Sequence, residues 1–221
     1  GVRFGATLLG SRAVAGTFDA KALDAVYLNG MSMRDALAGS GLDAGRIADA
    51  ARRAGDVLAY AELHIEQGPV LESLGASVGV VTAINGGNRF VVDIGGMAGH
   101  AGTVPMRLRR DALAAAAECV LATEAAAQAR SDVVATVGKL EAAPGAVNVI
   151  PGHVRFTLDV RAPTDVARIE AVKSIREACE AIARRRGVTW SIEPLWEAST
   201  AACESALQRQ FAAAVEGEGL P

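Results

Sequence analysis

The order of strand and helix patterns after residue 88 constrains the fold more than any other feature of this sequence. Residues 153–161 alternate cleanly, with an apolar side chain at every second position: Val154, Phe156, Leu158 and Val160. A period of two places these side chains on one face of a strand. Further strand patterns lie at 89–94, 133–141 and 188–195, and long helical patterns at about 105–130 and 165–186. This β-α-β-β-α-β order predicts a split βαβ module, with a four-stranded antiparallel sheet, two helices on one face, and a polar open face.

Local signals set the expected boundaries of these elements. The four residues from Asn85 to Asn88, with two central glycines, predict a turn before the strand at 89–94. Pro105 is expected to open the first long helix, and Gly187 to end the second. On the second helix, the apolar residues expected to face inward are Val166, Ile169, Val172, Cys179 and Ile182.

An apolar stretch at 57–65 predicts a buried strand ahead of the module. Gly68 breaks this pattern, and a short helix is expected at 69–74, with Pro69 in its first turn. His64 and Glu66 are two residues apart, so a strand would place them on the same face. An imidazole and a carboxylate at a strand end suit a metal or catalytic corner. The plainer alternative is a histidine that is hydrogen-bonded within a turn.

Composition excludes several classes of function. The net charge is −3, and the only run of like charges is at 184–186, so nothing indicates a nucleic-acid-binding surface. No apolar run is long enough to span a bilayer, and no signal peptide is recognisable. The three cysteines are far apart and lack CxxC spacing, which favours reduced thiols in a cytoplasmic protein.

The histidines do not assemble a complete metal site. A catalytic zinc normally needs three protein ligands, and the chain has three histidines in all, no HExxH motif and no paired cysteine ligands. His100 lies in a glycine-rich loop at 95–102, where it either donates to a substrate oxygen as an oxyanion stabiliser or is simply exposed to solvent. His153 is interpreted as a surface residue.

Two further polar residues are candidates for substrate binding. Asn148 is an amide among valines, and it needs partners if it is buried; otherwise it satisfies the backbone of a turn. Arg161 ends a strand on the polar face, where a guanidinium suits bidentate carboxylate recognition. Its alternative role is an ion pair with Asp159 or Asp165.

The combination of motifs resembles the hydantoinase/carbamoylase amidase family. That family includes N-carbamoyl-L-amino-acid hydrolases, β-ureidopropionases and allantoate amidohydrolases, within the aminoacylase-like dinuclear metallohydrolases. The resemblance covers essentially the whole chain. The segments that carry it, in the family's order, are 64–72 (HIEQGPVLE), 99–106 (GHAGTVPM), 110–113 (RDAL), 148–152 (NVIPG) and 156–161 (FTLDVR).

The resemblance implies roles for five residues. By motif, His64 looks like a metal ligand, and Gln67 like a substrate contact beside it. His100 looks like the catalytic residue that stabilises the carbonyl oxygen, reaching the site across a dimer. Asn148 and Arg161 look like substrate binders, with Arg161 gripping the carboxylate.

The resemblance also implies an organisation in three segments. Residues 1–77 are expected to be part of a zinc-exopeptidase-like α/β catalytic domain. Residues 78–196 are expected to be an inserted ferredoxin-like lid and dimerisation domain, and 197–221 a return to the catalytic domain, with a helix at about 204–215. The chain starts at Gly1 without Met and ends at Pro221 without a tail, which is typical of an internal fragment.

The expected function follows from these implied roles. The intact enzyme is expected to be a metal-dependent amidohydrolase with two divalent ions, zinc or manganese. It would cleave the C–N bond of a ureido group in a small carboxylate substrate such as allantoate or an N-carbamoyl-L-amino acid, as a homodimer formed through the lid. Family members carry further metal ligands on both sides of the segment matched here, so the metal centre of this chain is expected to be incomplete. The alternatives are an inert lid and dimerisation fragment, or an aminoacylase or peptidase of the same superfamily.

Overall fold

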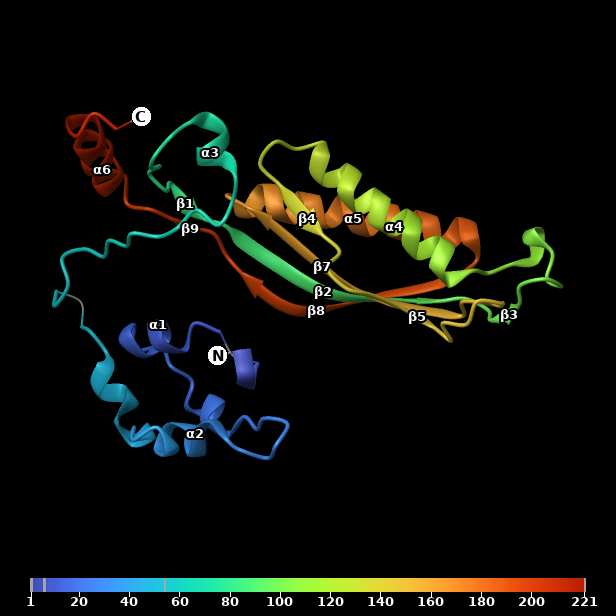
Figure 1. The fold of residues 1–221 in the computed structure, drawn as a ribbon, viewed down its shortest axis with the longest axis horizontal. Coiled ribbons are helices and arrows are strands. Elements are labelled where there is room, and N and C mark those ends of the chain that lie inside the picture. The colour runs from blue at the N-terminus through green and yellow to red at the C-terminus, as the bar shows by residue number, and fades with distance from the viewer. Residues whose placement is uncertain (1, 6, 54, 221) are drawn as a thin grey trace. The chain divides into compact units, whose positions relative to one another are not determined.

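The computed structural model describes residues 2–5, 7–53 and 55–220, so Gly1 and Pro221, on which the fragment prediction rests, lie outside the described residues. The chain divides into two compact units, Gly1–Gln67 and Gly68–Pro221 (Figure 1). None of the helices in the described ranges has the length and apolar character needed to cross a membrane.

The first unit is built from short helical segments around a few buried side chains. Its helix α2 begins with a capping box, in which the Ser32 hydroxyl accepts a hydrogen bond from the Asp35 amide at 3.1 Å and the Asp35 carboxylate accepts from the Ser32 amide. Leu23 and Met33 are its buried apolar residues among those described. Its elements are η1 Val2–Phe4, α1 Leu9–Val14, η2 Ala20–Asp24, α2 Met33–Gly39 and η3 Ala44–Ala50.

The prediction of a buried strand at 57–65 is wrong. This segment has no regular secondary structure, and Leu58, Leu63 and Ile65 are exposed. A strand exists only when its backbone N–H and C=O groups bond to a neighbouring strand. None of the strands described pairs with residues 57–65, so their apolar character alone does not produce one.

The second unit begins with the predicted short helix. It is α3, Val70–Leu74, and Gly75 ends it at a φ of 65°, which glycine adopts without a steric penalty. After it comes the short strand β1, Ala83–Ile84, which pairs antiparallel with β9, Ala201–Ala202. The helix predicted at 204–215 is present as α6, Ser205–Gly217.

The split βαβ module is confirmed. Its sheet runs in the order β4-β7-β2-β8, every pair is antiparallel, and β5 also pairs with β7. Helices α4 and α5 lie together on one face of this sheet (Figure 1). The elements are β2 Gly86–Gly95, α4 Ala112–Gln128, β4 Val134–Thr136, β5 Leu140–Ala143, β7 His153–Ala162, α5 Asp165–Arg186 and β8 Thr189–Ala198.

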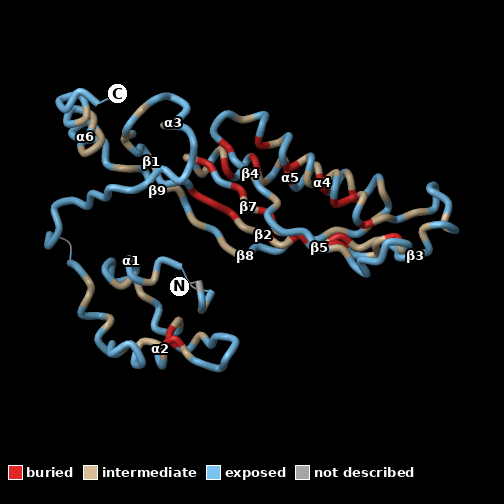
Figure 2. Tube along the Cα trace, viewed as in Figure 1, coloured by how far each residue is buried: buried red, intermediate tan, exposed pale blue. Residues whose placement is uncertain are grey.

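The core of the module lies between the sheet and the two helices (Figure 2). The sheet contributes Val154, Phe156, Leu158 and Val160, the four residues predicted from the period of two, together with Phe90, Val92 and Ile94 of β2. The helices contribute mainly small residues, including Ala115, Ala116 and Ala171, all fully buried. Small side chains let the helices approach the sheet closely, so a core with few aromatic residues still packs.

The turn predicted at 85–88 is wrong, because β2 already begins at Gly86 and Asn88 is buried within it. Gly86 is needed instead because the backbone of Thr200 approaches it closely. A Cβ at Gly86 would lie 2.8 Å from the backbone nitrogen of Thr200, a separation that real Cβ atoms do not tolerate.

The first long helix begins later than predicted. Asp111 is its N-cap, and the carboxylate accepts hydrogen bonds from the amides of Leu113 and Ala114. The residues before it, which were predicted to be part of the helix, form the 3₁₀ segment η4, Met106–Leu108.

The inward face predicted for the second helix is partly wrong. Val166 and Ile169 are exposed, whereas Arg168, Ala171 and Ile175 are buried. The prediction failed because apolar residues also flank the buried face of this helix, so the sequence does not show which of them point inward. The strand predicted at 133–141 is divided into β4 and β5, with residues 137–139 between them.

Candidate functional site

His100 and Asn148 are brought together at one end of the module. β3, Gly99–His100, pairs antiparallel with β6, Val149–Ile150, and places His100 opposite Val149. The Ala101 amide donates to the Asn148 carbonyl oxygen at 2.9 Å. Two polar residues that are distant in sequence therefore meet on adjacent backbone segments.

The His100 ring is held in one tautomer by its own loop. Its Nδ1 accepts a hydrogen bond from the Gly102 amide at 3.0 Å. A neutral imidazole that accepts at Nδ1 carries its proton on Nε2. His100 is exposed, so this Nε2–H is a donor that an oxygen atom of a ligand can reach.

Arg109 supports this loop, and the sequence interpretation missed it. Its Nη2 donates to the Ala101 carbonyl at 2.6 Å, and its Nε donates to the Val104 carbonyl at 3.0 Å. The guanidinium thus ties together the two ends of the segment that follows His100. Arg107, Arg109 and Arg110 stand close together in the sequence, and nothing in their spacing distinguishes the one that turns back to the loop.

Arg161 lies on the open face of the sheet in a bidentate ion pair. Its Nε and Nη2 donate to the two oxygens of Asp159, each at 2.9 Å. This pairing holds the pKa of the Asp159 carboxyl below its usual range and raises the pKa of Arg161. The ion pair with Asp159 was one of the two roles considered for Arg161 from the sequence.

Arg161 and His100 are at opposite ends of the module. β7 pairs with β2 from His153 opposite Gly95 at one end to Ala162 opposite Gly86 at the other. A ten-residue strand with a rise of about 3.3 Å per residue is roughly 30 Å long. β3 lies beyond one end of this strand (Figure 1), whereas Arg161 is next to its last residue at the other end. One copy of the module therefore cannot place His100 and Arg161 on the same small molecule.

His64 and Gln67 lie in the first unit, on the exposed segment before α3. The Nδ1 of His64 is 2.6 Å from the carbonyl oxygen of Ile65. With the proton on Nδ1, the Nε2 lone pair is left for a ligand, as is usual for metal-binding histidines. Gln67 has a φ of 57°, a left-handed conformation that is uncommon outside glycine.

The chain's described residues do not form a complete metal site. Within those residues, no group of three or more His, Cys, Asp or Glu side chains is placed to hold an ion. His64 fits one ligand position, but a catalytic zinc site normally takes three protein ligands. His153, the third histidine, binds Asp93 at 2.8 Å on the open face of the sheet.

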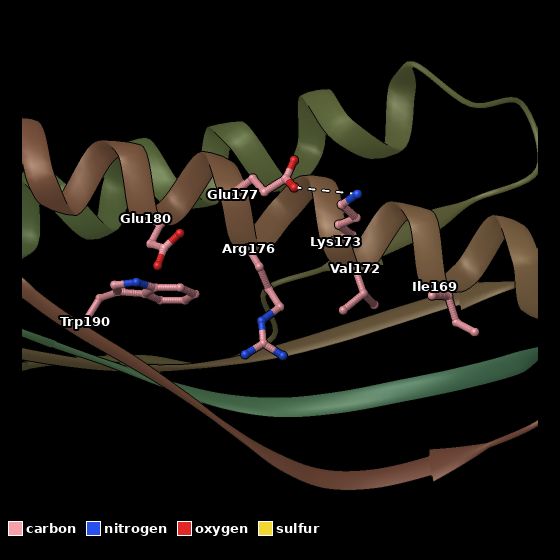
Figure 3. A pocket seen from close by; sticks show the side chains of 7 residues that line it. All are labelled: Ile169, Val172, Lys173, Arg176, Glu177, Glu180 and Trp190. Carbon is pink, nitrogen blue, oxygen red and sulfur yellow. Dashed lines mark ion pairs between the residues drawn. The ribbon is translucent and has the colours of Figure 1, made fainter.

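A shallow groove runs along the outer side of α5 beside β8 (Figure 3). Val172 and the Trp190 ring form its apolar part together with Ile169, and charged side chains border it. One of the border pairs is Lys173 with Glu177, at 3.9 Å. None of the five residues predicted to form the site lines this groove.

Comparisons with known proteins agree with the motifs. Residues 82–187 match the peptidase dimerisation domain. The chain is 42% identical over 221 residues to an N-carbamoyl-L-amino acid amidohydrolase from Geobacillus stearothermophilus, covering 100% of this chain and 54% of that protein. It is 39% identical to a probable allantoate deiminase from Oryza sativa, covering 94% of this chain and 46% of that protein.

Solved structures give the same result. A hydantoinase/carbamoylase family amidase from Burkholderia ambifaria matches with a TM-score of 0.86 and 32% identity, covering 99% of this chain and 53% of that one. The chain thus spans about half the length of the relatives it matches.

Proposed function

Because this chain belongs to the hydantoinase/carbamoylase family of amidases, we propose that it forms part of an enzyme that cleaves the C–N bond of a ureido group. The substrate class is a small carboxylate that carries this group, either an N-carbamoyl-L-amino acid or allantoate. Relatives of both kinds match the chain at similar identity, so neither substrate is preferred.

The geometry of His100 is the observation that carries this proposal. Its Nε2–H is set by the Gly102 amide, and it stands beside Asn148 in an exposed loop. In our proposal this donor stabilises the oxygen of the ureido carbonyl as negative charge develops there. Asn148 and Gln67 bind the substrate, and Arg161 holds its carboxylate.

We also propose two divalent ions, zinc or manganese, in the complete enzyme, with His64 as one ligand. Such ions supply a water molecule of lowered pKa for hydrolysis. The contact of the His64 Nδ1 with the Ile65 carbonyl supports this assignment, because it leaves Nε2 available.

A homodimer formed through the module is the proposed assembly. The distance between His100 and Arg161 supports it, since a small substrate can meet both residues only if they come from different copies. The match to a peptidase dimerisation domain supports it as well. β8 is an outer strand of the sheet, and we assign the contact to this strand and the apolar groove beside it. We also propose a cytoplasmic location, which the three free cysteines support, because thiols stay reduced in that compartment.

A substrate panel on the complete protein tests the function. We expect hydrolysis of N-carbamoyl-L-amino acids or allantoate, and little hydrolysis of N-acetyl amino acids or dipeptides. We expect His100→Ala to lower kcat by about a hundredfold or more, as removal of an oxyanion donor does in other enzymes. A preference for N-acetyl amino acids or dipeptides would overturn the ureide assignment in favour of an aminoacylase or peptidase.

The alternative is that this chain acts as a lid and dimerisation module without activity of its own. The split βαβ module has its own sheet, helices and core, which supports this alternative. Metal analysis separates the two possibilities. Two ions bound per 221-residue chain would contradict the inert alternative, and their absence together with dimer formation would support it.

A further inference from the structure

Asp159 is shared by two arginines on the open face of the sheet. Its Oδ1 accepts from the Arg161 Nε, and its Oδ2 accepts from both the Arg161 Nη2 and the Arg89 Nε. The Arg89 contact is 2.8 Å and joins adjacent strands, because Arg89 on β2 is directly opposite Asp159 on β7. One carboxylate thus lies between two guanidinium groups, and the cluster has a net charge of +1.

The Arg89 side chain also stacks on the ring of Trp196. The Arg89 guanidinium lies 4.9 Å from the centre of the Trp196 ring, which is within cation–π range. The pairing between β2 and β8 shifts between Arg89 and Phe90, and this irregularity brings Trp196 opposite Arg89. Without the shift, Leu195 would occupy that position, so the local backbone irregularity has a specific effect on Arg89.

The ion pair uses only one edge of the Arg161 guanidinium. Nε and Nη2 bind Asp159, while Nη1 has no bonded partner in the part of the chain that the structure describes. Arg161 is 46% exposed, and the cluster borders a shallow depression on the open face, lined also by Thr136, Thr157 and Leu195. A guanidinium fixed along one edge by a carboxylate presents its other donors in a defined direction.

We propose that Asp159 and Arg89 are positioning residues for Arg161. Asp159 orients the guanidinium so that its remaining donors face the carboxylate of the substrate, and Arg89, stacked on Trp196, keeps Asp159 in place. The net charge of the cluster matches one carboxylate, so the preferred ligand at this position is a monoanionic carboxylate group. This inference rests on the proposed role of Arg161 in the proposed ureide hydrolysis.

Matched substrates provide the test in the complete protein. One is an N-carbamoyl-L-amino acid, and the other is its carboxamide, which keeps the ureido group and lacks the charge. We expect Asp159→Asn to raise KM for the acid about tenfold and to leave kcat within about threefold. Kinetics on the carboxamide are expected to stay unchanged. Arg89→Met is expected to produce a smaller change of the same kind, and Asp159→Glu to recover part of the loss.

Asp93→Asn is the matched control. Asp93 is a carboxylate on the same face, and it binds His153 and Arg155 near the other end of β7. We expect this variant to leave KM for both substrates unchanged. Thermal unfolding of every variant identifies any that fail to fold.

The outcomes separate this inference from the function on which it rests. If Asp159→Asn changes both substrates equally, or neither, Asp159 does not position Arg161 and the inference is wrong. If Arg161→Ala leaves the acid and the carboxamide unchanged while the wild type hydrolyses ureides, the clamp role fails and the function survives. If the wild type hydrolyses no ureide, the function fails. Calorimetric titration of the N-carbamoyl acid into the same variants then decides whether Asp159 and Arg89 support carboxylate binding, and equal affinities would overturn the inference.

Discussion

Arg168 is a buried cation at the base of the module, and its removal should destabilise the sheet. The residue is 1% exposed and lies on α5. Its Nη1 donates to the amide oxygen of Asn88 and to Glu197, and its Nη2 donates to Asp165. We expect Arg168→Met to lower the free energy of unfolding by about 2 kcal/mol.

The magnitude follows from what the substitution leaves behind. Asn88 is 7% exposed, and an amide oxygen that loses its donor there costs about 1–3 kcal/mol. The Asp165 and Glu197 side chains are 40% and 61% exposed, so they return to water and we assign them no share. Methionine keeps much of the volume of the arginine stem, which limits the effect of a cavity.

Tryptophan fluorescence in urea measures this effect selectively. The chain has two tryptophans, Trp190 and Trp196, and both lie on β8. Unfolding of the module is therefore observed without a tryptophan signal from the first unit. With a slope of about 2 kcal/mol/M, the midpoint should fall by about 1 M.

Two control variants make the reasoning refutable. Arg176→Met changes an exposed arginine on the same helix and should move stability by less than about 0.5 kcal/mol. In an Asn88→Leu background, Arg168→Met should cost less than about 1 kcal/mol, since no amide oxygen is left unpaired. If Arg168→Met matches the wild type, or if the Asn88→Leu background does not reduce its cost, the assignment to the buried amide is wrong.

Three further predictions concern the loop, the sheet and the ion pairs. Arg109→Ala in the complete protein should lower kcat about tenfold, because the segment after His100 loses its support. The thermal midpoint should change by no more than a few degrees. An unchanged kcat would contradict the role of Arg109 in supporting the His100 loop. Gly86→Ala should destabilise the module by about 1–3 kcal/mol in the fluorescence assay, because the added methyl group meets Thr200. Gly217→Ala is the control: a Cβ added there has no neighbour within 4 Å, so this variant should not destabilise the module. The pKa of Asp159 is depressed in the folded state, chiefly by Arg161. Its contribution to stability is therefore present above the usual carboxyl pKa of about 4 and is lost as the pH falls below that value. Asp159→Asn should weaken the loss of stability below about pH 4, and an identical pH profile would refute this.

The fold was predictable where the signal is periodic and local. The alternation at 153–161 predicted the buried face of β7, because the face of each residue follows from its position along the strand alone. Gly86 shows the opposite case. Its role depends on Thr200, a residue 114 positions away, and a glycine required for close approach has the same appearance in a sequence as a glycine in a turn. The stretch at 57–65 failed for a related reason, since a strand is defined by partners that an apolar pattern does not identify.

The site was predictable as a set of residues but not as an arrangement. The motifs identified His100 and Asn148, while the short pairing of β3 with β6 that joins them is too brief to leave a periodic signal. Arg109 is one of three arginines close together in the sequence, and their spacing does not show which of them contacts the His100 loop. Asp159 was considered only as an alternative partner of Arg161, because its second contact, with Arg89, requires knowing that β2 and β7 are neighbours in the sheet.

The length of β7 has a consequence for mixed subunits. If each site takes Arg161 from one copy and His100 from the other, two inactive variants can complement each other. A dimer that combines a His100→Ala chain with an Arg161→Ala chain contains one site with both defects and one site with neither. Random re-association of equal amounts should then restore about one quarter of the wild-type activity. No such recovery is possible if both residues serve a site within a single chain.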